Sequence, residues 1–524
     1  MNPGTVRAVV KRSTYQDSVV LLALARQLRA ATGVLEVAAL MGTPSNRDLL
    51  AQSGLLTPEA AAAGANDLVL AIRANSAVAA EGALSQAETF LMAKQRRLEG
   101  TGRPLPRTLE SARRHLPDAN LVLISVPGAF AATETRKALR MGLHVMLFSD
   151  NVPLEEEVAL KQLAASKGLL LMGPDCGTAI LNGVPLGFAN AVPRGRIGFV
   201  AASGTGLQHV ASLLAAQGEG VSQAIGVGGR DMTERVGGLM MLQALDALGA
   251  DPSTELLVVI GKPPAPAVRE HVEARLHALG KPCVAVLLGK GVDVRSDGTF
   301  LTVATLEDAA AAAVALLRRE AWRPRAFRAP QAEIRRRVQE VRQTLASGQR
   351  AIRGLFAGGT LAHEAALVLE RLLGPVATHL APGSVGTHSV VDLGADEFTV
   401  GRPHPMLDAT VRAEEIRKAG EMPDLAVLLL DVVLGYGAAP DPAGDIAPAI
   451  ESARAEAMAC GRGLSVVASV IGTAEDPQGL AGQIARLEAA GVWVLPSNAQ
   501  AARAAACIAG GEPILRLLLD AREG

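Results

Sequence analysis

The stretch GFVAASGTGLQHV, residues 198–210, decides the fold. Its first half is an apolar strand, its second half has the spacing of a helix, and Ser203-Gly204-Thr205-Gly206 joins them. A buried strand that turns through glycines into a helix is the unit of a parallel sheet covered by helices. The first N–H groups of such a helix have no acceptor within the helix, so the turn predicts an α/β fold and a place where an anion can bind.

The same alternation of apolar strands and helices occurs along the whole chain. Near the N-terminus the strands are VRAVV (6–10), VLEVAALMG (34–42) and DLVLAIRA (67–74). The alternation predicts an α/β protein built of tandem doubly wound parallel sheets. We expect four segments: an N-terminal α/β region at 1–189, a second domain at 190–325, a linker helix at 326–349 and a third domain at 350–524.

The composition argues against several classes of partner. The 51 Lys and Arg residues nearly balance the 52 Asp and Glu residues, so the net charge is −1 and no long-range field attracts nucleic acid or an anionic membrane. No uncharged apolar run reaches the roughly 18 residues of a membrane span. The four cysteines lie far apart without a CxxC pair, which disfavours a disulfide framework or a zinc site. We expect a cytoplasmic protein with no metal centre and no nucleic-acid or membrane partner.

The loop at Ser203, Gly204 and Thr205 is the first candidate site, because ligands of open α/β sheets bind at the carboxyl ends of strands. A helix N-terminus carries about half a positive charge and open N–H groups. The alternative is that Ser203 or Thr205 is only an N-cap, contributing about 1 kcal/mol. A cap does not require two glycines at the tip, so the pattern favours phosphate binding.

A second candidate loop, GVGGRD at 226–231, follows the next strand of the same domain. Gly228 and Gly229 allow close approach of another backbone, and Arg230 offers a bidentate fork to a phosphate or carboxylate. A plain turn with a surface ion pair is the competing interpretation.

A third candidate loop, MGPDCGTAI at 172–180, places Asp175 and Cys176 after a buried strand. Cys176 is a candidate nucleophile, but no histidine is near it in sequence. A packed loop thiol is therefore the favoured interpretation, and we keep both residues as candidate substrate contacts.

A fourth candidate loop lies within residues 391–416, where Arg402 and His404 stand between prolines in the run GRPHP. Prolines stiffen the backbone, so these two side chains are the candidate catalytic groups. His388 and Asp392 on the preceding strand alternate with apolar residues and are expected to be structural. The run FAGGTLAHEA at 356–365 repeats the glycine-then-helix design and is expected to be a weaker version of the first loop.

Several long motifs resemble known families. The runs RMGLHVMLFSDNVPLEEEVALKQLAASKGLLLMGPDCG, GRIGFVAASGTGLQ, AIGVGGRD and GKPCVAVLLGK resemble the alpha subunit of succinyl-CoA synthetase in order and spacing. The third domain, through VVDLG, RAEEI and AVLLLDVVLGYG, resembles the carboxy-terminal domain of the beta subunit. With YQDSV, MGTPSN, GPDCGT and TVGRPHPM also present, the chain is similar to the FdrA family over nearly its whole length. The resemblance implies a Rossmann-like, CoA-binding-type half followed by two flavodoxin-like domains.

The resemblance also implies a site between helix ends. In the synthetase two helix N-termini from two subunits hold a phosphohistidine; Ser203 to Thr205 match the alpha one, and the loop from Gly394 to the helix after Pro405 matches the beta one. This chain departs from the synthetase in three ways. No histidine loop follows CVAVLLGK, YQDSV replaces the glycine-rich CoA fingerprint, and there is no room for an ATP-grasp domain.

The FdrA resemblance implies one subunit of an oxamate carbamoyltransferase, which splits oxalurate with phosphate into oxamate and carbamoyl phosphate in allantoin catabolism. Ser203, Gly204 and Thr205 would hold phosphate, Arg402 would clamp an anion, and His404 would donate to the carbonyl or move a proton, with Arg230 in reserve. No cofactor is certain; phosphate or carbamoyl phosphate is the expected ligand, and CoA stays open as a ligand although its motif is not seen. We expect an oligomer with other protein subunits. The alternatives are an acyl-CoA synthetase and a non-catalytic scaffold subunit.

Overall fold

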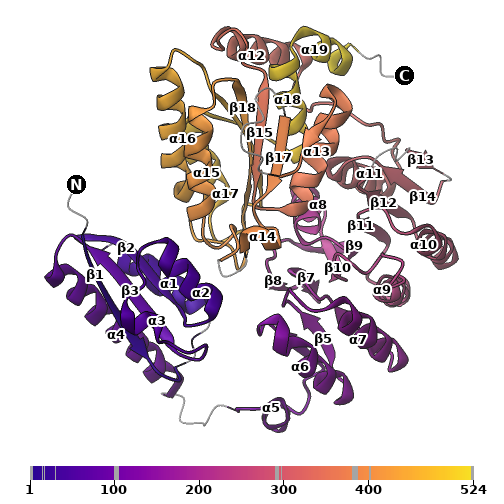
Figure 1. Ribbon diagram of the computed structural model, residues 1–524. Coiled ribbons are helices and arrows are strands. Elements are labelled where there is room, and N and C mark those ends of the chain that lie inside the picture. Colours follow the sequence, from indigo (N-terminus) through magenta and orange to yellow (C-terminus); the bar gives the residue numbers. More distant parts are fainter. Residues whose placement is uncertain are drawn as a thin grey trace. The chain divides into compact units, whose positions relative to one another are not determined.

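The computed structural model describes residues 4–14, 16, 18–29, 31–99, 106–289, 294–296, 298–379, 388–399 and 403–520. They form two compact units, Met1–His115 with Asp396–Pro403, and Leu116–Ala395 with His404–Gly524. The described strands make four sheets, one in the first unit and three in the second (Figure 1).

The first unit contains a three-stranded sheet in the order β1-β3-β2, and β3 is antiparallel to both neighbours. The expectation of a parallel sheet is therefore wrong for this region. Two apolar clusters cover the two faces of β3, so that strand is almost completely buried and reads in sequence like the interior strand of a parallel sheet. The elements are β1 (Thr5–Lys11), α1 (Ser18–Arg29), β2 (Val34–Met41), α2 (Pro44–Gln52), α3 (Pro58–Ala61), β3 (Leu68–Ala74), α4 (Ala77–Glu99), α5 (Leu109–His115) and α14 (Asp396–Thr399).

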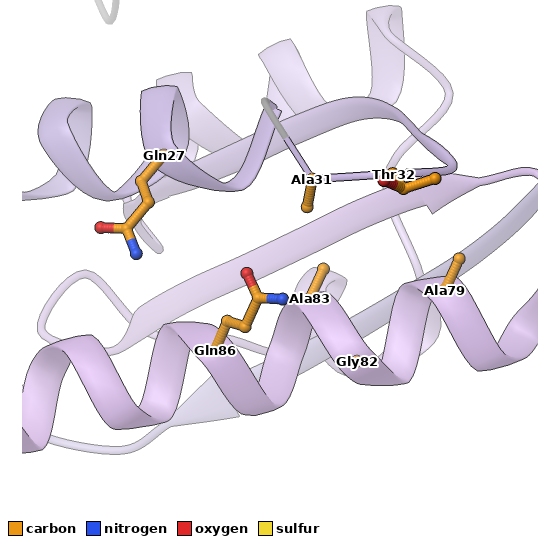
Figure 2. Close-up of a pocket in the computed structure, with 7 residues that line it drawn as sticks. All are labelled: Gln27, Ala31, Thr32, Ala79, Gly82, Ala83 and Gln86. Atoms are coloured by element: carbon orange, nitrogen blue, oxygen red, sulfur yellow. The ribbon is translucent and has the colours of Figure 1, made fainter.

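An open groove of ≈ 460 Å³ lies between α1 and α4 (Figure 2). Its walls are small or uncharged, so they offer no group that could exchange a proton or bind an anion strongly. The groove is lined by Gln27, Ala31, Thr32, Ala79, Gly82, Ala83 and Gln86.

The second unit begins with three parallel strands in the order β4-β5-β6, accompanied by two helices. This is the expected Rossmann-like half. Its elements are β4 (Leu121–Ile124), α6 (Gly128–Arg140), β5 (His144–Leu147), α7 (Leu154–Ser166) and β6 (Leu171–Met172).

An eight-stranded sheet follows, in the order β13-β14-β12-β11-β9-β10-β7-β8. Its parallel part, β10-β9-β11-β12-β14, has the strand order 2-1-3-4-5 of a flavodoxin-like fold. The antiparallel hairpin β7–β8 precedes residue 190 but pairs with β10, so this sheet starts before the expected second segment. The elements are β7 (Thr178–Leu181), β8 (Val184–Gly187), β9 (Arg194–Ala201), α8 (Gly204–Ala215), β10 (Val221–Gly226), α9 (Leu239–Ala250), β11 (Leu256–Gly261), α10 (Pro266–Leu279), β12 (Cys283–Leu287), β13 (Arg295–Ser296), β14 (Phe300–Val303) and α11 (Leu306–Arg318).

The last sheet is wholly parallel, in the order β16-β17-β15-β18-β19-β20, and β17-β15-β18-β19-β20 repeats the flavodoxin-like order. One continuous apolar core joins it to the eight-stranded sheet through α8, α11, α13 and α18 (Figure 1). The elements are α12 (Gln331–Gln343), β15 (Ala351–Phe356), α13 (Gly359–Leu373), β16 (Val376–Ala377), β17 (His388–Asp392), α15 (Thr410–Glu421), β18 (Leu425–Val433), α16 (Pro442–Ala459), β19 (Ser465–Ile471), α17 (Leu480–Ala489), β20 (Val492–Leu495), α18 (Asn498–Gly510) and α19 (Glu512–Leu519).

The α/β class and the tandem parallel sheets are thus confirmed for the second unit. Among the described residues, every helix is too short or too polar to cross a bilayer.

Candidate active site

Helix α8 begins as the sequence predicts, directly after β9. Ser203 is its N-cap, with extended backbone, and its Oγ accepts a hydrogen bond from the N–H of Gly206 at 3.0 Å. A side chain at Gly206 would collide with that hydroxyl, which explains the second glycine of the loop. The N–H groups of Gly204 and Thr205 occupy the first two helical positions and have no acceptor within the helix.

Helix α13 begins in the same way after β15, but a buried carboxylate holds its loop. The Oδ1 and Oδ2 atoms of Asp431 accept hydrogen bonds from the N–H groups of Ala357 and Gly358, both at 2.8 Å. Arg412 donates to Asp431 Oδ1 at 2.8 Å and neutralises it. No side chain caps α13 at its N-cap, Gly358. The open N–H groups at this end are therefore those of Gly359 and the residues that follow it.

The two helix N-termini meet. Ser203 Oγ and Thr360 Oγ1 lie 2.6 Å apart, and a Cβ placed on Gly358 would be 3.1 Å from Thr205 Cβ. Two positive dipole ends at one place repel each other unless an anion lies between them. The arrangement therefore suits a tetrahedral oxyanion bound by N–H groups from both helices.

The site lies at the switch points of the two flavodoxin-like sheets, where such folds bind ligands. Lys262 follows β11 at one of them and is exposed; it has no hydrogen-bond or ion-pair partner within the described part of the chain. The carbonyl of the preceding residue, Gly261, accepts a hydrogen bond from the N–H of Leu288 at 2.8 Å. The carbonyl of Leu288 in turn accepts from Nε2 of His363, which lies one turn into α13, at 3.1 Å. Burial, together with the charge of Lys262, lowers the pKa of His363. Lys262 is thus a cation beside the α13 end of the site.

His404 borders the α13 side of the site. A Cβ built on Gly394 would lie 2.5 Å from His404 Nε2 and 3.1 Å from Asp392 Oδ1, so the imidazole and the carboxylate flank one point. A side chain at Gly359 would in turn collide with Asp392, which places that carboxylate against the start of α13. The Phe188 ring packs on His404 with centroids 5.9 Å apart. Burial lowers the pKa of His404 to about 4, so its ring is neutral at neutral pH.

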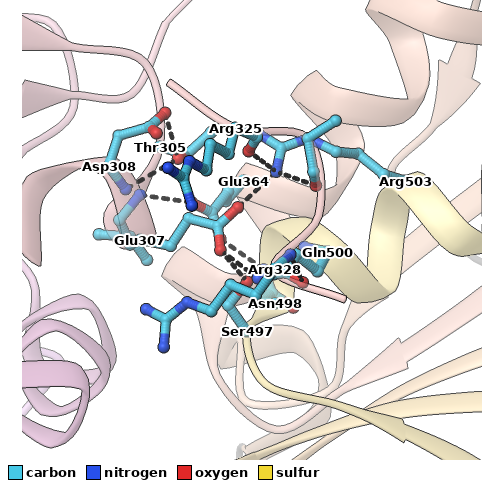
Figure 3. A network of polar contacts seen from close by, with 12 residues as sticks. Thr305, Glu307, Asp308, Arg325, Arg328, Glu364, Ser497, Asn498, Gln500 and Arg503 are labelled. Atoms are coloured by element: carbon cyan, nitrogen blue, oxygen red, sulfur yellow. Dashed lines mark hydrogen bonds and ion pairs between the residues drawn. The ribbon is translucent and has the colours of Figure 1, made fainter. Parts of the chain in front are cut away.

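A buried polar network connects α11, α13 and α18 (Figure 3), and one further bond from α18 reaches α8. Asn498, at the start of α18, donates from Nδ2 to Glu364 Oε2 at 2.8 Å and to Leu361 O at 2.9 Å, both on α13. The N–H of Asn498 donates to His209 Nε2 on α8 at 3.2 Å. Burial raises the pKa of Glu364 to about 7. The other residues labelled in the figure are Thr305, Glu307, Asp308, Arg325, Arg328, Ser497, Gln500 and Arg503.

The candidate loop at 226–231 has a packing role in the structure. Gly228 has a φ of +85°, and a side chain there would strike Pro174 O. Gly229 faces open space. Arg230 Nε lies 2.7 Å from Glu157 Oε2, and its Nη2 donates to Val152 O at 2.8 Å. The guanidinium is therefore engaged within the protein, as the ion-pair interpretation predicts.

The candidate loop at 172–180 holds a packed thiol. Cys176 is buried, and burial raises its pKa to about 12, so no thiolate forms near neutral pH. The Sγ atom lies 3.5 Å from Gly226 O. Asp175 adopts a φ of +55° beside it. Burial and the raised pKa disfavour the thiolate that a nucleophile needs, as the packed-thiol interpretation expects, and substrate contacts of Asp175 and Cys176 stay predictions. Arg402, the other predicted catalytic residue, lies outside the described residues.

Sequence reasoning missed two members of the site. The second helix end is that of α13 with Thr360, whereas the sequence pattern favoured the helix after Pro405 and indicated only a weaker version of the first loop at the start of α13. The signal was present in the repeated glycine-then-helix pattern at 356–365. Lys262 had no comparable signal, because a lone lysine before two prolines reads as a solvated turn.

Two family models match separate parts of the chain. A family model described as CoA-ligase matches residues 355–508, and one described as "AllF, heavy metal-associated domain" matches residues 4–104. The latter segment contains no cysteine and no histidine, so it lacks the thiolate and imidazole ligands that many metal sites use. Within the described residues, no three His, Cys, Asp or Glu side chains converge as a metal site requires.

A protein of Escherichia coli (strain K12) named YahF is 41% identical over 505 residues, which are 94% of this chain and 96% of that protein. The chain belongs to the YahF family. This YahF-family chain is also 30% identical over 198 residues to the succinate–CoA ligase [ADP-forming] subunit alpha of Aquifex aeolicus (strain VF5), covering 37% of this chain and 63% of that subunit. A dinucleotide-forming acetyl-coenzyme A synthetase of Ca. Korarchaeum cryptofilum overlays with a TM-score of 0.34 and 16% identity, over 81% of this chain and 88% of that one.

The YahF-family protein is therefore succinyl-CoA-synthetase-like, as its motifs predicted, and it has an AllF-type N-terminal domain. These matches support a ligase-type enzyme family. The narrower FdrA assignment and the carbamoyl transfer that it implies are not among these findings.

Proposed function

We propose that this protein transfers an acyl group to inorganic phosphate at the site between α8 and α13. The contact between Ser203 and Thr360 carries the proposal, because it brings the open N–H groups of two helices to one place. Ser203, Gly204 and Thr205 would bind phosphate from one side, and Gly359 and Thr360 from the other.

The proposed step is a phosphorolysis. An oxygen of hydrogen phosphate forms a bond to the acyl carbon, and the bond from that carbon to the leaving sulfur or nitrogen breaks. The leaving atom takes the proton of the hydrogen phosphate, so an acyl phosphate and a thiol or amide result. Negative charge grows on the carbonyl oxygen during attack, and one well-placed donor there lowers the barrier by about 3 kcal/mol.

The first candidate substrate is an acyl-CoA thioester. The CoA-ligase match over residues 355–508 and the succinate–CoA ligase relative favour it. In this version the products are free CoA and an acyl phosphate. A complete ADP-forming ligation would need partner subunits to move the phosphoryl group onward.

The second candidate substrate is a ureido acid, as the FdrA resemblance implies. The AllF model over residues 4–104 favours it. Oxalurate and hydrogen phosphate would give oxamate and carbamoyl phosphate, with Arg402 binding the carboxylate or the phosphate. Other subunits would complete a cytoplasmic carbamoyltransferase of allantoin catabolism, with no CoA required.

The test uses the full chain together with the subunits encoded beside it. The complex is incubated with labelled phosphate and either a panel of acyl-CoA thioesters or oxalurate. Phosphate-dependent thiol release supports the first candidate, and carbamoyl phosphate, trapped with hydroxylamine as hydroxyurea, supports the second. If neither product forms, the proposed function is refuted.

Variants separate a catalytic role from a scaffold role. S203A and T360V remove the two hydroxyl groups that meet at the helix ends, and S166A removes a hydroxyl bonded only to Leu163 O on α7. We expect S203A and T360V to weaken phosphate binding while S166A does not. Full activity of the complex with both site variants would mean that the chain is a scaffold subunit.

A further inference from the structure

We infer that Phe188 and the N–H of Met406 hold His404 as a neutral hydrogen-bond donor through Nε2, so that His404 acts on the acyl carbonyl and does not carry a phosphoryl group. The assignment deepens the proposed function and rests on it for the identity of the acyl group. Phe188 is then a positioning residue, because it acts only through His404.

The backbone of Met406 decides which nitrogen of His404 carries the proton. The N–H of Met406 donates to His404 Nδ1 at 3.2 Å. An N–H group only donates, so Nδ1 must present its lone pair. A neutral imidazole has one N–H, and here it is on Nε2. That atom is the one that faces the point shared with Gly394 and Asp392.

Phe188 keeps the ring neutral and in place. Its ring packs on His404 with a centroid distance of 5.9 Å and a tilt of 36°, and the Phe148 ring packs on Phe188 with centroids 5.5 Å apart. The backbone of Phe188 is anchored as well, since its carbonyl accepts from Thr178 Oγ1 at 2.6 Å. This apolar cover excludes water, which disfavours the imidazolium form. Asp392 is the charged group that faces the ring across Gly394.

A neutral imidazole with its proton on Nε2 is an electrophile. It can donate to an oxygen on which negative charge develops, and such donors act most strongly where water is excluded. Phosphoryl transfer to Nε2 would instead require a lone pair on that nitrogen. Because the hydrogen bond from Met406 places the proton of the neutral ring on Nε2, that nitrogen has no lone pair, and a phosphohistidine at Nε2 is disfavoured.

Substitution by amides tests the donor role. A glutamine side chain can place an N–H near the Nε2 position, whereas the shorter asparagine cannot. We expect H404Q to stay within about tenfold of the wild-type rate and H404N to lose about 100-fold or more, the range of a single oxyanion donor. Equal loss in both variants, or acid-labile phosphate on His404 after incubation with carbamoyl phosphate or acetyl phosphate, would overturn the inference.

A second measurement needs no substrate. Nitrogen-15 NMR of the full chain reports the tautomer and the pKa of each histidine. We expect the Nε2–H form for His404 and a rise of its pKa towards 6.5 in F188L and F188A. We expect no rise in F148L, which alters the ring that packs on Phe188. The Nδ1–H form, or an unchanged pKa in both Phe188 variants, refutes the inference. Absence of phosphorolysis in the wild type would refute the proposed function and leave the NMR result standing.

Discussion

Replacing Gly394 by alanine displaces His404 without removing any polar group. The added Cβ would lie 2.5 Å from His404 Nε2, and 3.0 Å from Ala357 O. Carbon and nitrogen atoms pack at about 3.5 Å, so the ring must retreat by roughly 1 Å. Gly394 does not have a positive φ, so alanine fits its backbone. The change therefore tests the position of the imidazole rather than the fold.

A misplacement of about 1 Å at a reacting centre costs about 100-fold in rate. We therefore expect G394A to lower kcat of the reconstituted complex by about 100-fold in the phosphorolysis assay, with a melting temperature close to that of the wild type. The matched control is G482A, because Gly482 lies in α17 and a Cβ there meets no atom within 4 Å. An unchanged kcat in a folded G394A protein would show that His404 has no part in the chemistry.

Four further predictions concern the groups that build the site. T360V removes the partner of Ser203 and should lower stability by about 1 kcal/mol, while T360S should not, as thermal unfolding can measure. K262M should weaken the binding of inorganic phosphate about tenfold, as measured by calorimetry, because it removes a charge-assisted hydrogen bond that K262R keeps. If K262M binds phosphate as tightly as the wild type, this cation has no role in binding. R412M leaves a buried carboxylate unpaired and should cost about 3–5 kcal/mol in denaturant unfolding. Burial raises the pKa of Glu364 to about 7 from 4.5, so the stability that its protonated form contributes is present below pH 4.5 and is lost as the pH rises through 7. E364Q should therefore remove this loss from the pH dependence of the free energy of unfolding. If the loss persists in E364Q, it belongs to another group.

Much of the second unit could be predicted from the sequence because its signals are local. The glycine turn after the strand at 194–201 predicts the start of α8, and Ser203 caps that helix as expected. The same local pattern at 356–365 marks the start of α13. The contact between Ser203 and Thr360 could not be read in the same way, since the two residues are 157 positions apart and meet only through the packing of two domains.

Other expectations failed because the sequence does not show strand direction or pairing. β3 is apolar on both faces whether its neighbours are parallel or antiparallel, so the order of the first sheet was not determined by its pattern. Arg230 has the residue type of an anion clamp, but Glu157 lies 2.7 Å away and engages it. Whether an arginine is open to a ligand depends on such distant partners.

The two helix ends of this site belong to a single polypeptide, joined through the segment that contains α12. Their encounter is therefore intramolecular, and its effective concentration is set by the linking residues and not by how much protein is present. When a site is shared between two chains, dilution separates its halves. Here dilution leaves the two helix N-termini together. Under the proposed function, the phosphate affinity of the chain should then be the same at nanomolar as at micromolar protein.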